Sequence, residues 1–276
     1  MGEYIAFRRH GNVYAVNTAG GKPTQRASGG VFDFAFGRGG ALYVTRPNGH
    51  SCDLYTATGT RPLVRWSDIR DQVDRGEGLC DISSHPYGGV LFEADNFTLG
   101  SVATWLLDPR TQLVRGVGFG YQPAISRTGR RIVTVVRYYA PFGGGYMSLV
   151  MYEPGHPQAY RHVVPLPTRS YAPEYGSPSL SRDSRRLAAS RSSCGAITCV
   201  EELVVGPLGG RLRTTGFSVK TIRGTAWATD GKSLFVGAAR TEGERFDLYQ
   251  VPLNGDQPQI VLRGIGAWTI RGASMS

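Results

Sequence analysis

The 276-residue sequence predicts an all-β fold, and more narrowly a six-bladed β-propeller with four antiparallel strands in each blade. Short β runs recur at a regular interval, tight turns rich in Gly and Asp precede them, and no window of eleven or more residues has a clear helical period. The 38 glycines and 16 prolines agree with a chain that turns often. We expect one domain spanning residues 1–276, with at most a single helical turn, within residues 67–75.

Six similar β runs mark the repeat. Each carries an apolar pair, and the anchors of successive runs lie 41 to 54 residues apart. Four strands in about 40–45 residues are typical of a propeller blade, and six such intervals, counted through both termini, account for the whole chain. The anchors are Tyr14, Tyr55, Leu106, Val150, Val204 and Tyr249.

A tight turn between two β runs precedes five of the six anchors. Gly and Asp recur in these turns because both tolerate the positive φ that short hairpins require. The β run after each turn is apolar, as expected for a second strand packed between neighbouring blades. The turns lie at residues 38–40, 87–89, 127–129, 182–184 and 229–231.

The sixth blade is expected to combine the two ends of the chain. Residues 267–271 have the pattern of an inner strand, followed by a turn at Gly272 and Ala273, and residues 4–7 would supply the next strand. Closing the ring in this way removes an open sheet edge, which would otherwise promote aggregation.

Two parts of the chain have a residue pattern found in a known family of propellers. They are Thr229-Asp230-Gly231-Lys232-Ser233-Leu234-Phe235-Val236 with Asp247-Leu248-Tyr249 and Leu253-Asn254-Gly255, and Tyr4-Ile5-Ala6-Phe7 with residues 11–17 and Gly20-Gly21. This pattern resembles the repeat of TolB-like propellers and extends over essentially the whole chain. It departs at Asp108-Pro109 and at Ser184, where a turn Gly is replaced. The resemblance implies the fold but not one function, because the family includes periplasmic assembly proteins, sensor domains and propellers attached to peptidases.

The chain is strongly basic, with a net charge of +10, and 28 of its 31 basic residues are arginine. Codon bias of a high-GC genome would explain the arginine excess; the alternative is a surface that attracts anionic partners. The arginines form no run of five or more, so nucleic acid is not the expected partner. No stretch approaches 18 apolar residues, so we expect no membrane span in this chain.

The four cysteines suggest disulfides. Cys194 and Cys199 flank a four-residue loop whose neighbouring β runs must pair, so we expect a bridge across the hairpin mouth. Cys52 and Cys80 remain as a second pair, bridged or free; four free buried thiols are the alternative. Disulfides persist in oxidising compartments, which favours a secreted, periplasmic or cell-surface protein over a cytoplasmic one. The sequence opens directly into a predicted strand, so we expect a leader or anchor to precede it in the natural protein.

The predicted ring has two unlike faces. The tight-turn face carries the turns from first to second and from third to fourth strands. The loop face carries the second-to-third loops and the connections between blades, which are long and unlike one another. Variable loops on a rigid scaffold are where binding usually occurs, and the central channel opens on this face. The second-to-third loops are residues 46–52, 94–102, 137–146, 191–200 and 240–246.

Polar residues at the starts of the inner strands should line the channel mouth. They could order a cationic or polyhydroxyl ligand, or they could cap backbone groups and hold water. Arginines in the loops would meet anionic groups. The mouth residues are Asp33, Asp81, Gln122, Ser177 and Arg223, and the loop arginines are Arg46, Arg137 and Arg240.

The loop at residues 137–146 is the most suggestive single segment, because Tyr138 and Tyr139 follow Arg137 beside a run of glycines. Tyr175 continues the aromatic pattern one connection later. Tyr and Arg are enriched in binding hot spots. The alternative is aromatic packing between adjacent loops. If Tyr138 is a binding anchor, Tyr138→Ala should weaken binding and leave the melting temperature nearly unchanged.

The function expected from these residues is ligand or protein binding by a sensor or scaffold, with a protein, peptide or glycan recognised on the loop face. The alternative is a lyase or hydrolase that uses Asp33 or Asp81 as acid or base, with or without a metal. His10 and His50 near Asp53 could serve such a site, or could simply be exposed. There is no G-x-S-x-G elbow. We expect no cofactor and assign no catalytic residue.

Overall fold

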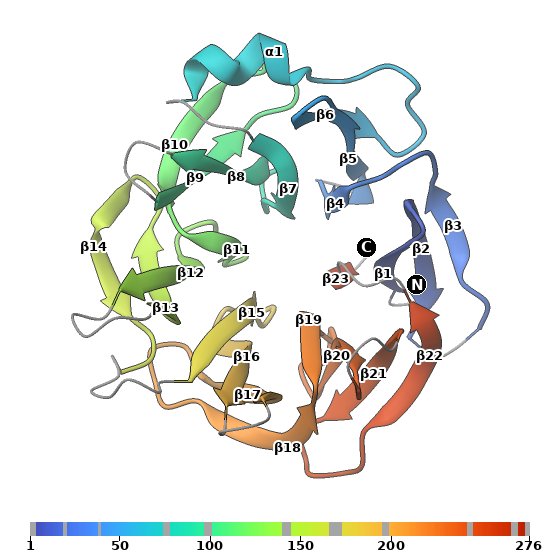
Figure 1. The fold of residues 1–276 in the computed structure, drawn as a ribbon, viewed down its shortest axis with the longest axis vertical. Coiled ribbons are helices and arrows are strands. Elements are labelled where there is room, and N and C mark those ends of the chain that lie inside the picture. Colours follow the sequence, from blue (N-terminus) through green and yellow to red (C-terminus); the bar gives the residue numbers. More distant parts are fainter. Residues whose placement is uncertain are drawn as a thin grey trace.

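The computed structural model describes residues 4–18, 21–37, 40–73, 78–96, 101–139, 145–165, 173–194, 199–241, 245–265 and 270–273. Its strands form six sheets arranged as a ring around a central axis (Figure 1). The all-β, six-bladed propeller predicted from the repeat is confirmed. Within the described residues, no helix reaches the length and apolarity needed to cross a bilayer.

The strands of the first three blades follow one another from the axis outward. Blade 1 is β23 (Ile270–Ala273), β1 (Tyr4–Arg9), β2 (Asn12–Asn17) and β3 (Thr24–Ala27). Blade 2 is β4 (Asp33–Phe36), β5 (Leu42–Asn48) and β6 (Ser51–Thr56). Blade 3 is β7 (Gly78–Ser84), β8 (Val90–Asn96), β9 (Ser101–Leu107) and β10 (Val114–Phe119).

The other three blades have the same antiparallel order. Blade 4 is β11 (Tyr121–Ile125), β12 (Ile132–Tyr139), β13 (Gly145–Glu153) and β14 (His156–His162). Blade 5 is β15 (Glu174–Leu180), β16 (Arg186–Cys194), β17 (Cys199–Pro207) and β18 (Arg213–Val219). Blade 6 is β19 (Thr221–Trp227), β20 (Ser233–Ala239), β21 (Phe246–Pro252) and β22 (Gln259–Ile265).

The two ends of the chain meet in blade 1. Strand β23 pairs antiparallel with β1, with Phe7 opposite Ile270 and Tyr4 opposite Ala273. The predicted closure is therefore confirmed, but the turn predicted at Gly272 and Ala273 is wrong. No covalent connection joins Ala273 to Tyr4, so no turn is needed and the pairing extends to Ala273. Residues 267–269 of the predicted inner strand lie outside the described residues.

Blade 2 departs from the predicted four strands. After β6, the place of an outer strand is taken by a single bridge between Leu54 and Val64 and by α1 (Trp66–Ile69) and η2 (Arg70–Gln72). Val64, Ile69 and Val73 bury their side chains in the cluster that contains Leu54, so the apolar residues are spaced to cover the sheet with a helical turn. The predicted helical turn is confirmed and begins at Trp66.

The core lies between neighbouring blades. Leu203 and Phe217 of blade 5, for example, pack with Trp227, Leu234 and Tyr249 of blade 6. All seven residues of β20 are buried, because its two faces pack against different blades. Where the second strand of a blade packs on both faces, as β20 does, it holds the loops that project from it in fixed positions.

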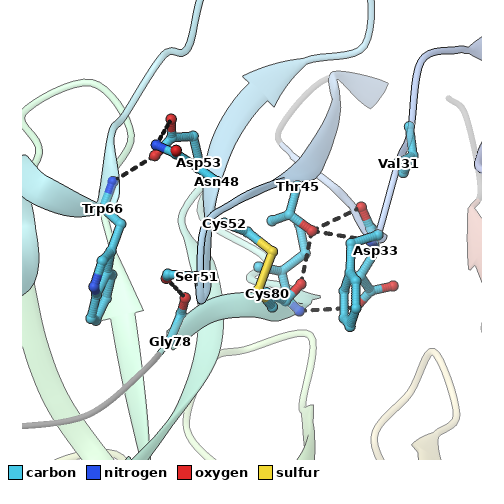
Figure 2. The surroundings of a disulfide bond; sticks show 12 residues. Val31, Asp33, Thr45, Asn48, Ser51, Cys52, Asp53, Trp66, Gly78 and Cys80 are labelled. Atoms are coloured by element: carbon cyan, nitrogen blue, oxygen red, sulfur yellow. Dashed lines mark hydrogen bonds between the residues drawn. A yellow bond between two sulfur atoms is a disulfide. The ribbon is translucent and has the colours of Figure 1, made fainter.

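Both disulfides are present. Cys194 and Cys199 are opposite one another on β16 and β17, with a Cα–Cα distance of 4.0 Å, and both are exposed. Cys52 on β6 bridges to Cys80 on β7 with a Cα–Cα distance of 4.9 Å, and Cys52 is fully buried (Figure 2). The first bridge closes a hairpin within one blade, whereas the second joins blade 2 to blade 3.

Candidate functional site

Inner strands approach the axis on the loop face through irregular backbone. The register of the inner strand against its neighbour shifts between Gly78 and Ile82, Tyr121 and Ala124, Gly176 and Ser179, and Ile222 and Thr225. Three non-glycine residues in these bulges have positive φ, namely Leu79, Gln122 and Ser177. A bulge leaves backbone N–H groups without a strand partner, so side chains must supply acceptors there.

Asp33 supplies one of these acceptors. Its carboxylate accepts a hydrogen bond from the backbone N–H of Ile82 at 2.9 Å, and the residue is only 3% exposed. The hydroxyl of Thr45, which is also buried, accepts a hydrogen bond from the N–H of Asp33 at 3.0 Å and donates one to the carbonyl of Cys80 at 2.8 Å (Figure 2). Asp33 therefore joins the inner strands of blades 2 and 3 beside the Cys52–Cys80 bridge.

Side-chain acceptors recur at the next blades. Glu93 accepts from the N–H of Gln122 at 2.6 Å, and Gln122 in turn accepts from the N–H of Ser177 at 2.6 Å. Glu201 accepts from the N–H of Ile222 at 2.8 Å. Burial raises the pKa of Glu201, while this hydrogen bond and the charge of Arg223 oppose the shift. The structure thus places Gln122 and Ser177 together, and puts Arg223 near Glu201.

Asp81 differs from Asp33 because it is exposed. Arg8 on β1 lies near both carboxylates and donates to the carbonyl oxygens of Val31 and Phe32. Burial lowers the pKa of the Arg8 guanidinium, and the charges of Asp33 and Asp81 oppose this shift. This corner of the mouth is therefore a charged cluster in which Asp33 is buried and Asp81 faces solvent.

Arg46 is held by its own blade and the preceding connection. Its guanidinium donates to the carbonyl oxygens of Gly59 at 2.9 Å and Ser28 at 3.0 Å, and it lies 4.4 Å from the centre of the Tyr55 ring. The side chain expected to meet a ligand anion is thus engaged in fixing the connection after β3.

The hairpin of blade 4 contains three of the predicted residues. Arg137 is exposed, and Tyr138 is half-buried against the core between blades 3 and 4. The Tyr138 ring stacks on Tyr146 with centroids 5.5 Å apart. Its pKa is raised, chiefly by burial and then by the Tyr160 hydroxyl nearby. The side chain of Tyr139 and residues 140–144 lie outside the described residues.

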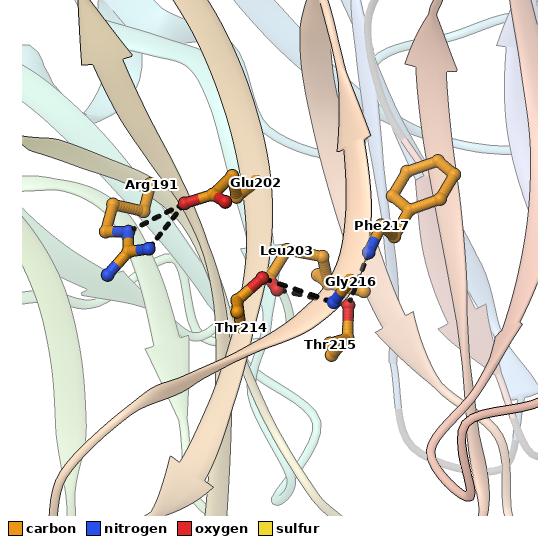
Figure 3. A network of polar contacts seen from close by, with 7 residues as sticks. All are labelled: Arg191, Glu202, Leu203, Thr214, Thr215, Gly216 and Phe217. Atoms are coloured by element: carbon orange, nitrogen blue, oxygen red, sulfur yellow. Dashed lines mark hydrogen bonds and ion pairs between the residues drawn. The ribbon is translucent and has the colours of Figure 1, made fainter.

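Tyr175 lies one blade further on, opposite Arg191 in the pairing of β15 with β16. The Arg191 guanidinium forms an ion pair with Glu202 on β17, and its Nε–Oε2 distance is 3.2 Å (Figure 3). Tyr175 and this ion pair form a polar patch on blade 5, at the loop-face end of the sheet.

A pocket of about 300 Å³ opens at the loop-face end of blade 6. Arg240 precedes the β20–β21 loop, Arg245 follows it, and Arg263 reaches the pocket from β22; Asp247 and Tyr249 complete its polar lining. Arg240 donates to the Tyr249 hydroxyl at 3.1 Å. Asp247 accepts from the N–H of Gly264 at 2.8 Å and lies 3.9 Å from the Arg263 guanidinium. Among the described residues, the pocket lining therefore holds three arginines and one carboxylate, which forms an ion pair with Arg263.

Sequence reasoning identified Arg240 but missed Arg245, Asp247 and Arg263. Arg245 ends the same loop, and its charge could have been noticed there. Arg263 lies in the outer strand, and only the pairing of β21 with β22 brings it to Asp247.

The histidine hypothesis finds little geometric support. Asp53 is 5% exposed and accepts from the N–H of Trp66 at 2.9 Å and from Asn48 at 3.0 Å, while His10 and His50 are exposed. Among the described residues, no three His, Cys, Asp or Glu side chains gather in a group that could hold a metal ion.

No protein-family model matches the chain, and no curated protein matches its sequence. The structure of TolB from Acinetobacter baumannii superposes with a TM-score of 0.70 at 14% identity, over 99% of this chain and 66% of that chain. The chain has a TolB-like propeller fold. It thus spans just under two thirds of the TolB chain. This shared fold agrees with the resemblance seen in the repeat.

Other solved propellers match this chain with lower TM-scores and comparable sequence identity. A puromycin hydrolase matches with a TM-score of 0.57 at 16% identity, over 85% of this chain and 39% of that chain. A gluconolactonase from Xanthomonas campestris matches with a TM-score of 0.56 at 16% identity, over 89% of this chain and 78% of that chain. Because fold does not determine function, the activity of this TolB-like chain must be argued from its own side chains.

Proposed function

We propose that the chain is a binding module that acts outside the cytoplasm and recognises an anionic group of a protein, peptide or glycan on its loop face. The observation that carries this proposal is the blade 6 pocket, in whose described lining Arg240, Arg245 and Arg263 accompany one carboxylate, Asp247. The described lining carries a net positive charge, which favours a carboxylate, phosphate or sulfate as the ligand.

The pocket is held in shape by contacts within blade 6 and with its neighbour. The Tyr249 ring is buried against Phe217, with centroids 5.2 Å apart, and its hydroxyl orients Arg240. Asp247 fixes the backbone at Gly264, next to Arg263. Groups fixed before binding lose less conformational entropy when a ligand arrives, so this frame favours recognition.

The proposed location has separate support. Both cysteine pairs are bridged, and disulfides persist mainly in oxidising compartments. The chain also shares its fold with TolB. A sensor or scaffold outside the cytoplasm is consistent with both observations, and the anionic partner would meet the ring on the face where the loops differ most.

The test is calorimetric titration of the folded chain with inorganic phosphate, sulfate, glucuronate and an acidic dipeptide. We expect at least one probe to bind in the millimolar range or tighter, and the double variant Arg240→Gln and Arg245→Gln to lose this binding. The matched control is Arg61→Gln and Arg65→Gln, which removes the same charge at two exposed arginines outside the pocket. Absence of binding for all four probes, or equal loss in both double variants, would contradict the proposal.

A further inference from the structure

The tight-turn face carries a repeated cationic hexapeptide. Residues 126–131 read Ser-Arg-Thr-Gly-Arg-Arg at the first turn of blade 4, and residues 181–186 read Ser-Arg-Asp-Ser-Arg-Arg at the first turn of blade 5. Both turns are built alike, since the Ser126 and Ser181 hydroxyls accept from the N–H groups of Arg131 at 3.0 Å and Arg186 at 2.9 Å. Equivalent arginines therefore project from equivalent positions of two adjacent blades.

Hydrogen bonds between turns bring these arginines together. The N–H of Arg127 donates to the Ser184 hydroxyl at 3.0 Å, which joins the turn of blade 4 to that of blade 5. The N–H of Leu208 donates to the carbonyl of Arg185 at 2.7 Å, which adds the third-to-fourth turn of blade 5. Seven arginines exposed on this surface are Arg127, Arg130, Arg131, Arg182, Arg185, Arg211 and Arg213.

The charge of this surface is mainly positive, although the second turns of blades 3 and 4 add Asp108 and exposed Glu153. Residues 126–131, 181–186 and 207–213 contain eight arginines and a single carboxylate, Asp183. Asp183 accepts from the Ser181 hydroxyl at 2.6 Å and from the N–H of Arg185 at 3.1 Å, and these bonds lower its pKa. In the adjoining turn of blade 6, Asp230 is accompanied by exposed Lys232.

Exposed apolar side chains project from the neighbouring turns of blade 3. Tyr87 in the first turn is 68% exposed, and Leu113 in the second is 66% exposed. The Tyr87 hydroxyl donates to the carbonyl of Thr128 at 2.9 Å, which attaches this turn to the arginine turn of blade 4. Large apolar residues at the tips of turns, beside a cluster of exposed arginines, are characteristic of surfaces that enter the headgroup region of a bilayer.

We propose that the tight-turn face of blades 3, 4 and 5 docks on a membrane rich in anionic phospholipid. Arginines would bind the phosphates of the headgroups, while Tyr87 and Leu113 would enter the interface. A site for a soluble polyanion would need the arginines alone, and a protein site would favour a groove over two protruding side chains. The inference goes beyond the proposed function, because docking by this face leaves the loop face directed away from the membrane.

The first test is co-sedimentation of the whole chain with vesicles of phosphatidylcholine, with or without phosphatidylglycerol. We expect binding to the anionic vesicles only, weakening as salt rises. The triple variant Arg127→Gln, Arg130→Gln and Arg185→Gln should bind about a hundredfold more weakly. The matched control removes three charges from the opposite face, by Arg240→Gln, Arg245→Gln and Arg263→Gln, and should retain binding.

The second test separates a membrane from other anionic partners. Replacing Leu113 by Ser, alone and with Tyr87→Ser, should weaken vesicle binding several-fold and leave binding to soluble heparin unchanged. Melting curves confirm that each variant is folded, and the single Leu113 variant decides the matter if the double one is not. The proposal is overturned by equal binding to both kinds of vesicle, by equal losses in the two arginine triples, or by unchanged vesicle binding of the folded serine variant.

Discussion

The side-chain oxygen of Gln122 accepts a hydrogen bond from the backbone N–H of Ser177 in the next blade, at 2.6 Å. Both residues have positive φ, 51° for Gln122 and 47° for Ser177. They lie in the bulges where inner strands leave their regular pairing. Polar side chains at the channel mouth thus supply acceptors that the irregular backbone needs, and blade-to-blade contact depends on them.

Gln122→Ala should lower the free energy of unfolding by about 1 kcal/mol, because the N–H of Ser177 loses its acceptor. Gln122→Gly loses the same bond but relieves the cost of positive φ, so it should be more stable than the Ala variant by about 1 kcal/mol. Urea denaturation of the two variants measures the difference. An Ala variant as stable as the parent would show that the bond contributes nothing.

The two disulfides should differ in their contributions to stability. Cys52 and Cys80 are 28 residues apart, whereas Cys194 and Cys199 are 5 apart. Loop-closure entropy predicts about 3–4 kcal/mol for the first and about 2 kcal/mol for the second. Paired Cys→Ala variants followed by thermal melting test this order, and the reverse order would contradict it.

Mild reductant with alkylation and mass spectrometry should label Cys194 and Cys199 first, because both are exposed.

Much of the ring could be predicted because its information is local. Tyr14, Tyr55 and Tyr249 recur at blade intervals, and Gly and Asp mark the turns between them. The roles of polar residues could not be predicted, because they depend on backbone that is distant in the sequence. Asp33 was expected at the channel mouth, and only the bulge of β7 shows that it accepts from Ile82, 49 residues away.

The clustering of the arginines on the tight-turn face was not predicted from the sequence for a related reason. Arg127 and Arg182 are far apart in the chain, and no local run of charge joins them. The ring places equivalent turns side by side, so residues one repeat apart become neighbours. Aligning the turns of blades 4 and 5 would have shown the shared hexapeptide, which is the signal that sequence reasoning did not use.

Stability should depend on pH through His85, which is 8% exposed. Its Nδ1 accepts from the N–H of Tyr87 at 3.3 Å. Burial, and then the charge of Arg115, lower its pKa below the ordinary 6.5. Because the folded state disfavours protonation of His85, neutral His85 contributes its full stabilisation to the folded state above pH 6.5. This contribution is lost as the pH falls from 6.5 through the lowered pKa of the folded state.

Urea midpoints measured from about pH 7.5 to about pH 5 should therefore fall, and His85→Asn should reduce the slope. Asn can still offer an oxygen acceptor to Tyr87 but does not titrate. His156→Asn changes an exposed histidine in the same way and serves as the control. If the His85 and His156 variants show the same slope as the parent, His85 does not contribute to the pH dependence.

Tyr138 is a predicted binding residue that packs against the core between two blades. Its ring packs on Tyr146 and on His162, each 5.5 Å away between centroids, and joins the core shared by blades 3 and 4. Tyr138→Ala should therefore lower the free energy of unfolding by about 2 kcal/mol. Tyr138→Phe keeps the ring contacts, so it should stay within about 0.5 kcal/mol of the parent. Tyr160→Ala, at a side chain 39% exposed, is the matched control and should cost less. A Tyr138→Ala variant that melts like the parent would contradict the packing role and return Tyr138 to the binding residues of the loop face.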